Sequence, residues 1–274
     1  MNIKRPVEIV VISDVHLGTY GCHAKELLSY LKSIQPKTLI LNGDIIDIWN
    51  FRKSYFPTSH MDVIRRIIKM ASKGTKVIYI TGNHDDLLRK YTDIEFGNIF
   101  LVDKYIMEFD QKKAWIFHGD VFDASTKGYA KFIARIGGKG YDWLILCNRF
   151  INWLLEKLGQ EKMSFSKKIK ARVKKAVSWI ANFETTAAEL AIEKKYDYVI
   201  CGHIHQPQMR IIKNNTGEVC YLNSGDWIEN LTALEYQDQE WSIYQYQKNE
   251  HQPSEPISSP NDVEFDLLTK IISN

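Results

Sequence analysis

Short apolar runs that end beside Asp, Asn or His recur five times along this chain of 274 residues. The first run is Val10 to Ile12, which is followed by Asp14, His16 and Gly18. A continuous run rich in β-branched residues is typical of a strand buried on both faces. Because strand side chains alternate in direction, Asp14 and His16 are expected to point to one side just beyond the strand. A carboxylate and an imidazole there would form half of a divalent-metal site.

The next two apolar runs end in the same way. Residues 38–41 lead to Asp44, and residues 77–80 lead to Asn83. Alternation of such strands with helices predicts a parallel sheet, whose ligands gather outside the carboxyl ends of the strands. Apolar residues at helical spacing place the intervening helices over residues 24–34 and 61–73.

The second half of the chain is expected to contain mainly strands. Residues 99–109 and 113–117 are predicted to form an antiparallel pair that ends at His118. A further strand over residues 196–201 ends near His203 and His205. Short strands of a second sheet are predicted over residues 208–212, 219–223, 232–236 and 241–246.

Seven side chains that follow these strand ends could share one metal centre. They are Asp14, His16, Asp44, Asn83, His118, His203 and His205. Carboxylate, imidazole and amide ligands without thiolate suit Mn²⁺, Fe²⁺, Zn²⁺ or Mg²⁺. Seven ligands exceed what one ion usually takes from a protein, so we expect two ions, which together activate water and hold a phosphoryl group. Any one of these residues alone is more often structural, but five such segments are not expected by chance.

Five sequence blocks resemble those of the calcineurin-like metallophosphoesterases, over residues 9–227. The blocks are Asp14-x-His16, Gly43-Asp44-x-x-Asp47, Gly82-Asn83-His84-Asp85, His118-Gly119-Asp120 and Gly202-His203-x-His205. Within that superfamily, residues 13–18, 43–49 and 222–227 are similar to the UDP-2,3-diacylglucosamine pyrophosphatases of lipid A biosynthesis. We therefore expect an α/β fold, a four-layer α/β/β/α sandwich with the metals where two sheets meet.

The resemblance also implies a division of the ligands between two ions, with Asp44 as the bridge. One ion is expected on Asp14, His16, Asp44 and His205, and the other on Asp44, Asn83, His118 and His203. Mn²⁺ is the first expectation for both ions.

The predicted catalytic residues are His84 and Asp85. His84 is expected to stabilise the transition state or to protonate the leaving oxygen, while Asp47 or Asp85 orients an imidazole. The best-known enzymes of the lipid A branch carry arginine at the position of His84. The resemblance therefore supports the chemistry more strongly than the lipid substrate.

Residues 124–194 lie between the fourth and fifth blocks and are predicted to form a helical cap. The first part of this stretch is apolar and the second is rich in lysine, which suits acyl chains beside phosphates or an anionic membrane surface. A helical hairpin that packs on itself and leaves its lysines in solvent is the alternative. Asn83 and Arg149 are the predicted substrate contacts, with Arg89 and Lys90 as further candidates.

The bulk properties add few constraints. The net charge of +3 favours no particular partner, and nucleic-acid binding is not expected because the lysine-rich stretch lacks interleaved aromatics. Four scattered cysteines and the lack of an evident secretory signal or membrane span favour the cytoplasm, with peripheral contact at the inner membrane. Residues 1–247 are predicted to form the metallophosphoesterase domain, and residues 248–274 a polar linker with a short helix.

Three functions fit these observations. The leading one is a two-metal hydrolase that converts UDP-2,3-diacylglucosamine to UMP and 2,3-diacylglucosamine 1-phosphate. The alternative is a metallophosphoesterase for another phosphomonoester or phosphodiester, such as a phospholipid, a nucleotide or a phosphoprotein. A non-catalytic scaffold is a remote third, because such a protein is expected to lack some of the ligands and none is missing.

Overall fold

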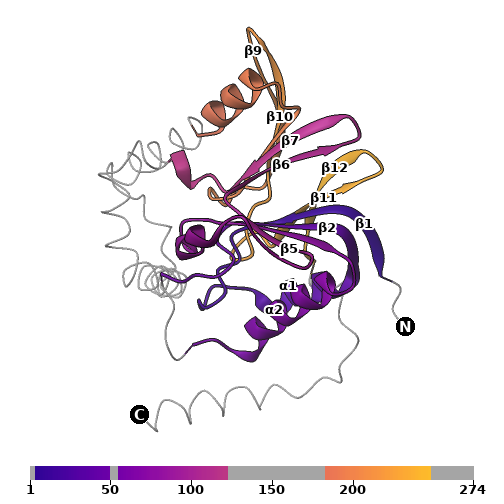
Figure 1. Cartoon of the computed structure of the whole chain (residues 1–274), viewed down its shortest axis with the longest axis vertical. Coiled ribbons are helices and arrows are strands. Elements are labelled where there is room, and N and C mark those ends of the chain that lie inside the picture. The colour runs from indigo at the N-terminus through magenta and orange to yellow at the C-terminus, as the bar shows by residue number, and fades with distance from the viewer. Residues whose placement is uncertain (1–3, 50–54, 123–182, 248–274) are drawn as a thin grey trace, which may run out of the picture.

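The computed structural model describes residues 4–49, 55–122 and 183–247, and these form two stacked β-sheets (Figure 1). The first sheet contains, in spatial order, β12 (Glu240–Gln245), β11 (Thr232–Gln237), β1 (Arg5–Ile12), β2 (Ile34–Asn42), β3 (Lys76–Ile80), β5 (Ile99–Val102) and β4 (Ile94–Phe96). The second sheet contains β6 (Lys104–Phe109), β7 (Lys112–Phe117), β8 (Tyr198–Cys201), β10 (Gly217–Asn223) and β9 (Gln208–Asn214). The predicted α/β class is confirmed.

The first sheet has a parallel centre with crossover helices, as predicted. Strands β1, β2, β3 and β5 run parallel, and helices α1 (Ala24–Ser33) and α2 (Thr58–Ala71) connect the first three. Both helices lie against the outer face of this sheet (Figure 1). Leu27 and Leu31 of α1 and Val63 of α2 are buried there with Val10 and Leu39 of the sheet. Parallel strands bring their carboxyl ends to one edge, where the candidate ligands follow.

A second core lies between the sheets, and a third lies behind the second sheet. Val11, Ile40 and Ile78 of the first sheet are fully buried with Ile116 and Ile200 of the second. A helix over residues 183–193 packs on the other side of the second sheet. Strands covered on both faces have no polar alternation, which explains the continuous apolar runs. Among the described residues, no helix is long and apolar enough to span a membrane.

Three details of the predicted fold are wrong. Strands β11 and β12 belong to the first sheet, since β11 pairs with β1 (Ile9 opposite Tyr236), and not to the second. Residues 99–109 form two strands, because the chain passes from the first sheet to the second at Asp103. The strand predicted over residues 38–41 begins earlier, at Ile34, so β2 contains Pro36. A proline is tolerated there because β3 pairs with β2 only from Thr38 onward, which leaves one side of β2 unpaired by a strand at Pro36.

Two predicted segments cannot be compared with the structure. Residues 124–182 of the predicted cap and residues 248–274 lie outside the described ranges. The predicted domain limits therefore stay a prediction.

Candidate metal centre

The predicted ligands follow strands of both sheets and meet where the two sheets adjoin. Asp14 and His16 follow β1, and Asp44 follows β2. His118 follows β7, and His203 follows β8. Three groups have ligand atoms within 4.8 Å of one another: Asp14, His16 and His205; His16, Asp44 and His84; and Asp44, His118 and His203. The structure thus brings together the six predicted ligands that are Asp or His, together with His84. The seventh, Asn83, follows β3 at the same edge of the first sheet.

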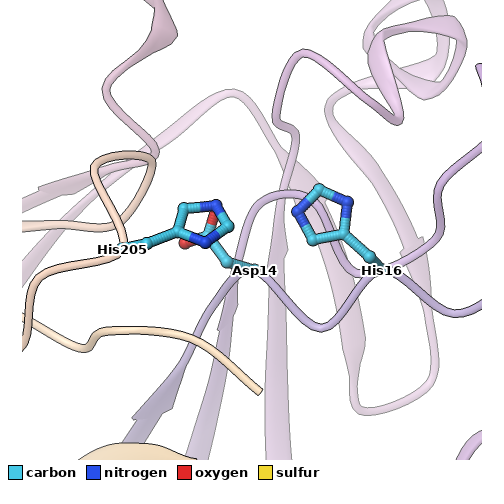
Figure 2. Close-up of side chains that lie close together, drawn as sticks. All are labelled: Asp14, His16 and His205. Carbon is cyan, nitrogen blue, oxygen red and sulfur yellow. The ribbon is translucent and has the colours of Figure 1, made fainter. Parts of the chain in front are cut away.

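Asp14, His16 and His205 form the first group. Figure 2 shows the His205 ring over the Asp14 carboxylate, with His16 facing the same space. His205 Nε2 lies 3.2 Å from Asp14 Oδ1, and the rings of His16 and His205 are 5.6 Å apart. The other oxygen of Asp14 accepts a hydrogen bond from the backbone N–H of His203 at 3.0 Å. One oxygen of this buried carboxylate is therefore held by backbone, and the other faces the imidazoles.

Asp44 belongs to both remaining groups, as expected for a bridging ligand. Its Oδ2 lies 3.2 Å from His118 Nε2 and 3.9 Å from His16 Nε2. Its Oδ1 accepts a hydrogen bond of 2.7 Å from the backbone N–H of His84. Asp44 thus lies between His118 of one predicted ion site and His16 of the other.

Acceptors behind the imidazoles determine which ring nitrogen faces the centre. His118 Nδ1 lies 2.9 Å from the carbonyl oxygen of Asn42, and His16 Nδ1 lies 3.2 Å from Asp47 Oδ2. A nitrogen beside a carbonyl oxygen must carry the proton, which leaves the Nε2 lone pair for a metal. His205 follows the same pattern more loosely, because its Nδ1 is 3.8 Å from Asp226 Oδ2.

Several buried atoms of the centre are suited to a cation. Asp14 Oδ1, His16 Nε2, Asn83 Oδ1 and His118 Nε2 are buried, and none of them makes a hydrogen bond to the residues that the structure describes. The 3.2 Å contacts from Asp14 Oδ1 to His205 and from His118 Nε2 to Asp44 are ion-pair contacts and not hydrogen bonds. A buried polar atom left unsatisfied costs about 1–3 kcal/mol, which a bound ion would offset. The donor set of carboxylate, imidazole and amide oxygen fits divalent ions.

The backbone is strained at these ligands. Five of them have positive φ: Asp14 (51°), His16 (53°), Asp44 (53°), His203 (67°) and His205 (54°). Residues other than glycine adopt this region at a cost of about 1–3 kcal/mol each, and such strain clusters at functional sites. Paired loops hold it in place, because the N–H groups of Asp14 and His16 donate to the carbonyls of Gly43 and Asp44 at 3.1 and 2.9 Å.

Two glycines allow the ligand loops to approach each other closely. A Cβ on Gly43, whose φ is +80°, would collide with the imidazole of His118. A Cβ on Gly82 would lie 2.6 Å from the backbone nitrogen of Asp44. The glycines of the sequence blocks are thus required by the packing of one ligand loop on another.

Comparison with known proteins is decisive on the family. The family model of the calcineurin-like phosphoesterases matches residues 7–207, which is most of the chain. The chain belongs to the calcineurin-like phosphoesterase family. It is accordingly a metal-dependent phosphoesterase, and the three ligand groups are the candidate sites for its divalent ions.

Several curated relatives of this chain are named UDP-2,3-diacylglucosamine hydrolase. The UDP-2,3-diacylglucosamine hydrolase of Aliivibrio fischeri is 26% identical over 245 residues, which cover 86% of this chain and 97% of that protein. The protein of the same name from Wigglesworthia glossinidia brevipalpis is 26% identical over 242 residues, or 82% and 88% of the two chains. A solved archaeal phosphodiesterase is 14% identical with a TM-score of 0.41 and covers 86% of this chain and 98% of that one.

The two predicted catalytic residues of this phosphoesterase differ in their surroundings. His84 is a quarter exposed, its ring lies 4.6 Å from that of His16, and its Nδ1 is 3.1 Å from Asp47 Oδ1. Asp85 is fully buried, and its oxygens accept from Tyr79 Oη at 2.6 Å and from two backbone N–H groups. Asp85 therefore holds the loop that carries His84, and its predicted catalytic role stays a prediction.

Asp47, the alternative candidate for orienting an imidazole, contacts both His16 and His84. Its side chain is almost completely buried. Of the predicted substrate contacts, Arg149 lies outside the described residues, and the substrate role of Asn83 stays a prediction. The sequence analysis missed Asp226, whose Oδ1 accepts from the N–H groups of residues 228–230 and whose Oδ2 faces His205. The only available indication was its place in the block at residues 222–227.

When no metal is bound, electrostatic attraction between the carboxylates and the imidazoles determines the charge states of the ligands. Burial alone would raise the pKa of Asp44, but the imidazoles of His118 and His16 lower it to about 2. Burial also acts against the His205 imidazolium, but Asp14 and Asp226 raise its pKa to about 9. The pKa of buried His118 is likewise raised well above 6.5, by Asp44 and Asp14. The metal-free centre is therefore held together by carboxylates and imidazolium groups.

These pKa shifts predict how the stability of the metal-free protein depends on pH. The lowered carboxylate pKa values stabilise the fold above about pH 4, and the raised imidazole values stabilise it below about pH 6.5. The imidazole contribution is lost as the pH rises through about 9, the pKa of His205. We expect the melting temperature in EDTA to fall between pH 6.5 and 9, and the increase produced by Mn²⁺ to grow over that interval, because protons compete for the ligands. A Mn²⁺ effect that shrinks with rising pH would contradict this prediction.

Proposed function

We propose that this chain hydrolyses UDP-2,3-diacylglucosamine to UMP and 2,3-diacylglucosamine 1-phosphate. The observation that carries the proposal is the similarity to curated proteins of that name over almost their full length. The complete set of candidate ligands supports it, because hydrolysis of a pyrophosphate bond by this family needs an intact centre. We propose Mn²⁺ as the preferred metal and, since the substrate is acylated, action at the cytoplasmic membrane surface.

The residues of the centre have separate roles in the proposed reaction. Bound divalent ions lower the pKa of water and neutralise phosphoryl oxygens. Asp44 and the surrounding imidazoles would hold these ions, and their outer partners keep each Nε2 turned inward. His84 lies beside the centre with its Nδ1 near Asp47. Burial alone would lower the pKa of His84, but Asp47 and Asp44 raise it above 6.5, so His84 is suited to donate a proton to the leaving oxygen.

A second candidate function follows from His84 itself. The best-known lipid A enzymes have arginine at this position, so a different phosphodiester or phosphomonoester is the alternative substrate. The two candidates share the metal centre and differ only in what surrounds the scissile bond. A substrate comparison can therefore separate them.

The test is release of UMP from UDP-2,3-diacylglucosamine in Mn²⁺ by the wild type and by His118→Ala. Bis-p-nitrophenyl phosphate serves as the generic substrate. His23→Ala is the matched control, since the His23 side chain is exposed and its ion pair is with Glu26 at 3.6 Å. We expect release of UMP that depends on metal and is lost in His118→Ala alone. Cleavage of the generic substrate only would overturn the lipid assignment and leave the phosphoesterase intact.

A further inference from the structure

Arg89 connects three polar residues at the junction of the two sheets. It lies in the 3₁₀ helix η1 (Asp86–Tyr91), which follows the Asn83 loop. Its Nη2 lies 2.9 Å from Asp120 Oδ2, and its Nε lies 2.7 Å from Asp103 Oδ1. The same Nε is 3.2 Å from Thr81 Oγ1, which itself donates to Asp103 at 2.8 Å. The guanidinium thus connects three separate segments of the chain.

Each partner of Arg89 lies close in sequence to a predicted metal ligand or at the point where the chain crosses between the sheets. Thr81 follows β3 in the first sheet and comes two residues before Asn83. Asp120 comes two residues after His118, the ligand that follows β7 in the second sheet. Asp103 is the residue at which the chain passes from the first sheet to the second. Arg89 therefore links the two sheets at the ends from which Asn83 and His118 emerge.

We propose that Arg89 is a positioning residue that sets the spacing between the Asn83 and His118 loops, and hence the affinity of the ion held by Asp44, Asn83, His118 and His203. This inference rests on the metal centre of the proposed function but not on the identity of the substrate. It differs from the sequence-based expectation that Arg89 contacts substrate, because Arg89 makes ion pairs with two carboxylates.

The geometry favours arginine specifically. The Asp120 side chain is only 10% exposed and that of Arg89 is 35% exposed, so the pair is partly shielded from water. Charge-assisted bonds below 3 Å in such a setting are stronger than neutral ones, and the planar fork of arginine can address two carboxylates at once. Burial opposes the charge of Arg89, but Asp120 and Asp103 raise its pKa further, so it stays charged. Lysine would keep the charge and lose one of the two contacts.

The test is Mn²⁺ binding to metal-free protein, measured by calorimetry for Arg89→Met and Arg89→Lys. Arg65→Met is the matched control, because Arg65 is exposed on α2 and pairs with Asp62 at 2.9 Å. We expect one of the two Mn²⁺ sites to lose about 10- to 100-fold in affinity in Arg89→Met, the range found when an outer partner of a metal ligand is removed. The Mn²⁺ affinity of Arg89→Lys should lie between those of the wild type and Arg89→Met, and that of Arg65→Met should equal the wild-type value. The KM of Arg89→Met for bis-p-nitrophenyl phosphate at saturating Mn²⁺ should stay close to that of the wild type.

Asp120→Asn provides a second and gentler perturbation of the same link. If Arg89 acts through Asp120, the Arg89→Met/Asp120→Asn double variant should bind Mn²⁺ only slightly more weakly than Arg89→Met alone, because the effects of substitutions at coupled residues are not additive. Unchanged Mn²⁺ affinity with a raised KM would identify a substrate contact and overturn the proposal. Lower thermal stability with unchanged Mn²⁺ affinity would reduce Arg89 to a purely structural role. Failure of the UDP substrate alone would affect only the proposed function.

Discussion

Asp44→Asn is expected to remove nearly all phosphodiesterase activity while leaving the fold intact. Asp44 faces His118 and His16 with one oxygen and is the carboxylate that belongs to two of the three candidate ligand groups. Asparagine keeps the size of the side chain but loses the negative charge that two cations would share. We expect kcat/KM for bis-p-nitrophenyl phosphate to fall by more than about 100-fold, because losing an outer partner alone costs 10- to 100-fold.

Asp62→Asn is the control for this variant, because Asp62 is an exposed carboxylate on α2 that pairs with Arg65. Its activity should equal that of the wild type. Metal analysis of Asp44→Asn should find fewer bound Mn²⁺ ions per chain. Wild-type activity with a full complement of Mn²⁺ would rule out Asp44 as the bridging ligand.

His84→Asn is expected to lower kcat by about 10²- to 10⁴-fold, the usual contribution of a general acid. His84 is beside the centre but keeps its Nδ1 toward Asp47, so Mn²⁺ affinity should change little. Because the pKa of His84 is raised above 6.5, the wild type should lose kcat as the pH rises and the imidazolium deprotonates. The variant should lack that alkaline decline.

The surface variant His23→Asn should keep wild-type kcat and the wild-type pH profile. A lower kcat or an altered pH profile in His23→Asn would argue against the role assigned to His84. If His84→Asn loses Mn²⁺ along with activity, then His84 is a ligand, as its grouping with His16 and Asp44 would allow. Retained kcat would mean that His84 does not take part in the reaction.

The centre could be predicted from sequence because its parts are local. Each ligand follows a buried strand directly, and the carboxyl ends of parallel strands must share an edge. Asp14 and His118 are distant in sequence, yet both follow such apolar runs. The pattern of strand, glycine and polar residue therefore carried most of the information about the site.

The features that sequence could not supply depend on distant contacts. Strand β11 is buried on both faces, because Ala233 packs in the core with the helices and Leu234 packs in the core between the sheets. Nothing in its own residues indicates that it pairs with β1 and β12. The crossing at Asp103 is likewise stabilised by Arg89 and Thr81. Asp85 directly follows His84 in sequence, whereas Asp47 lies in a different block, so only three-dimensional packing shows that Asp47 is the carboxylate in contact with the His84 imidazole.

The central claim, a two-ion centre built on these ligands, is tested most directly by the stoichiometry of Mn²⁺ binding to metal-free wild-type protein. Calorimetry supported by elemental analysis would measure it. The arrangement of Asp44 between two ligand groups predicts two Mn²⁺ ions per chain. A stoichiometry of one ion or none at saturating Mn²⁺ would contradict this account of the centre.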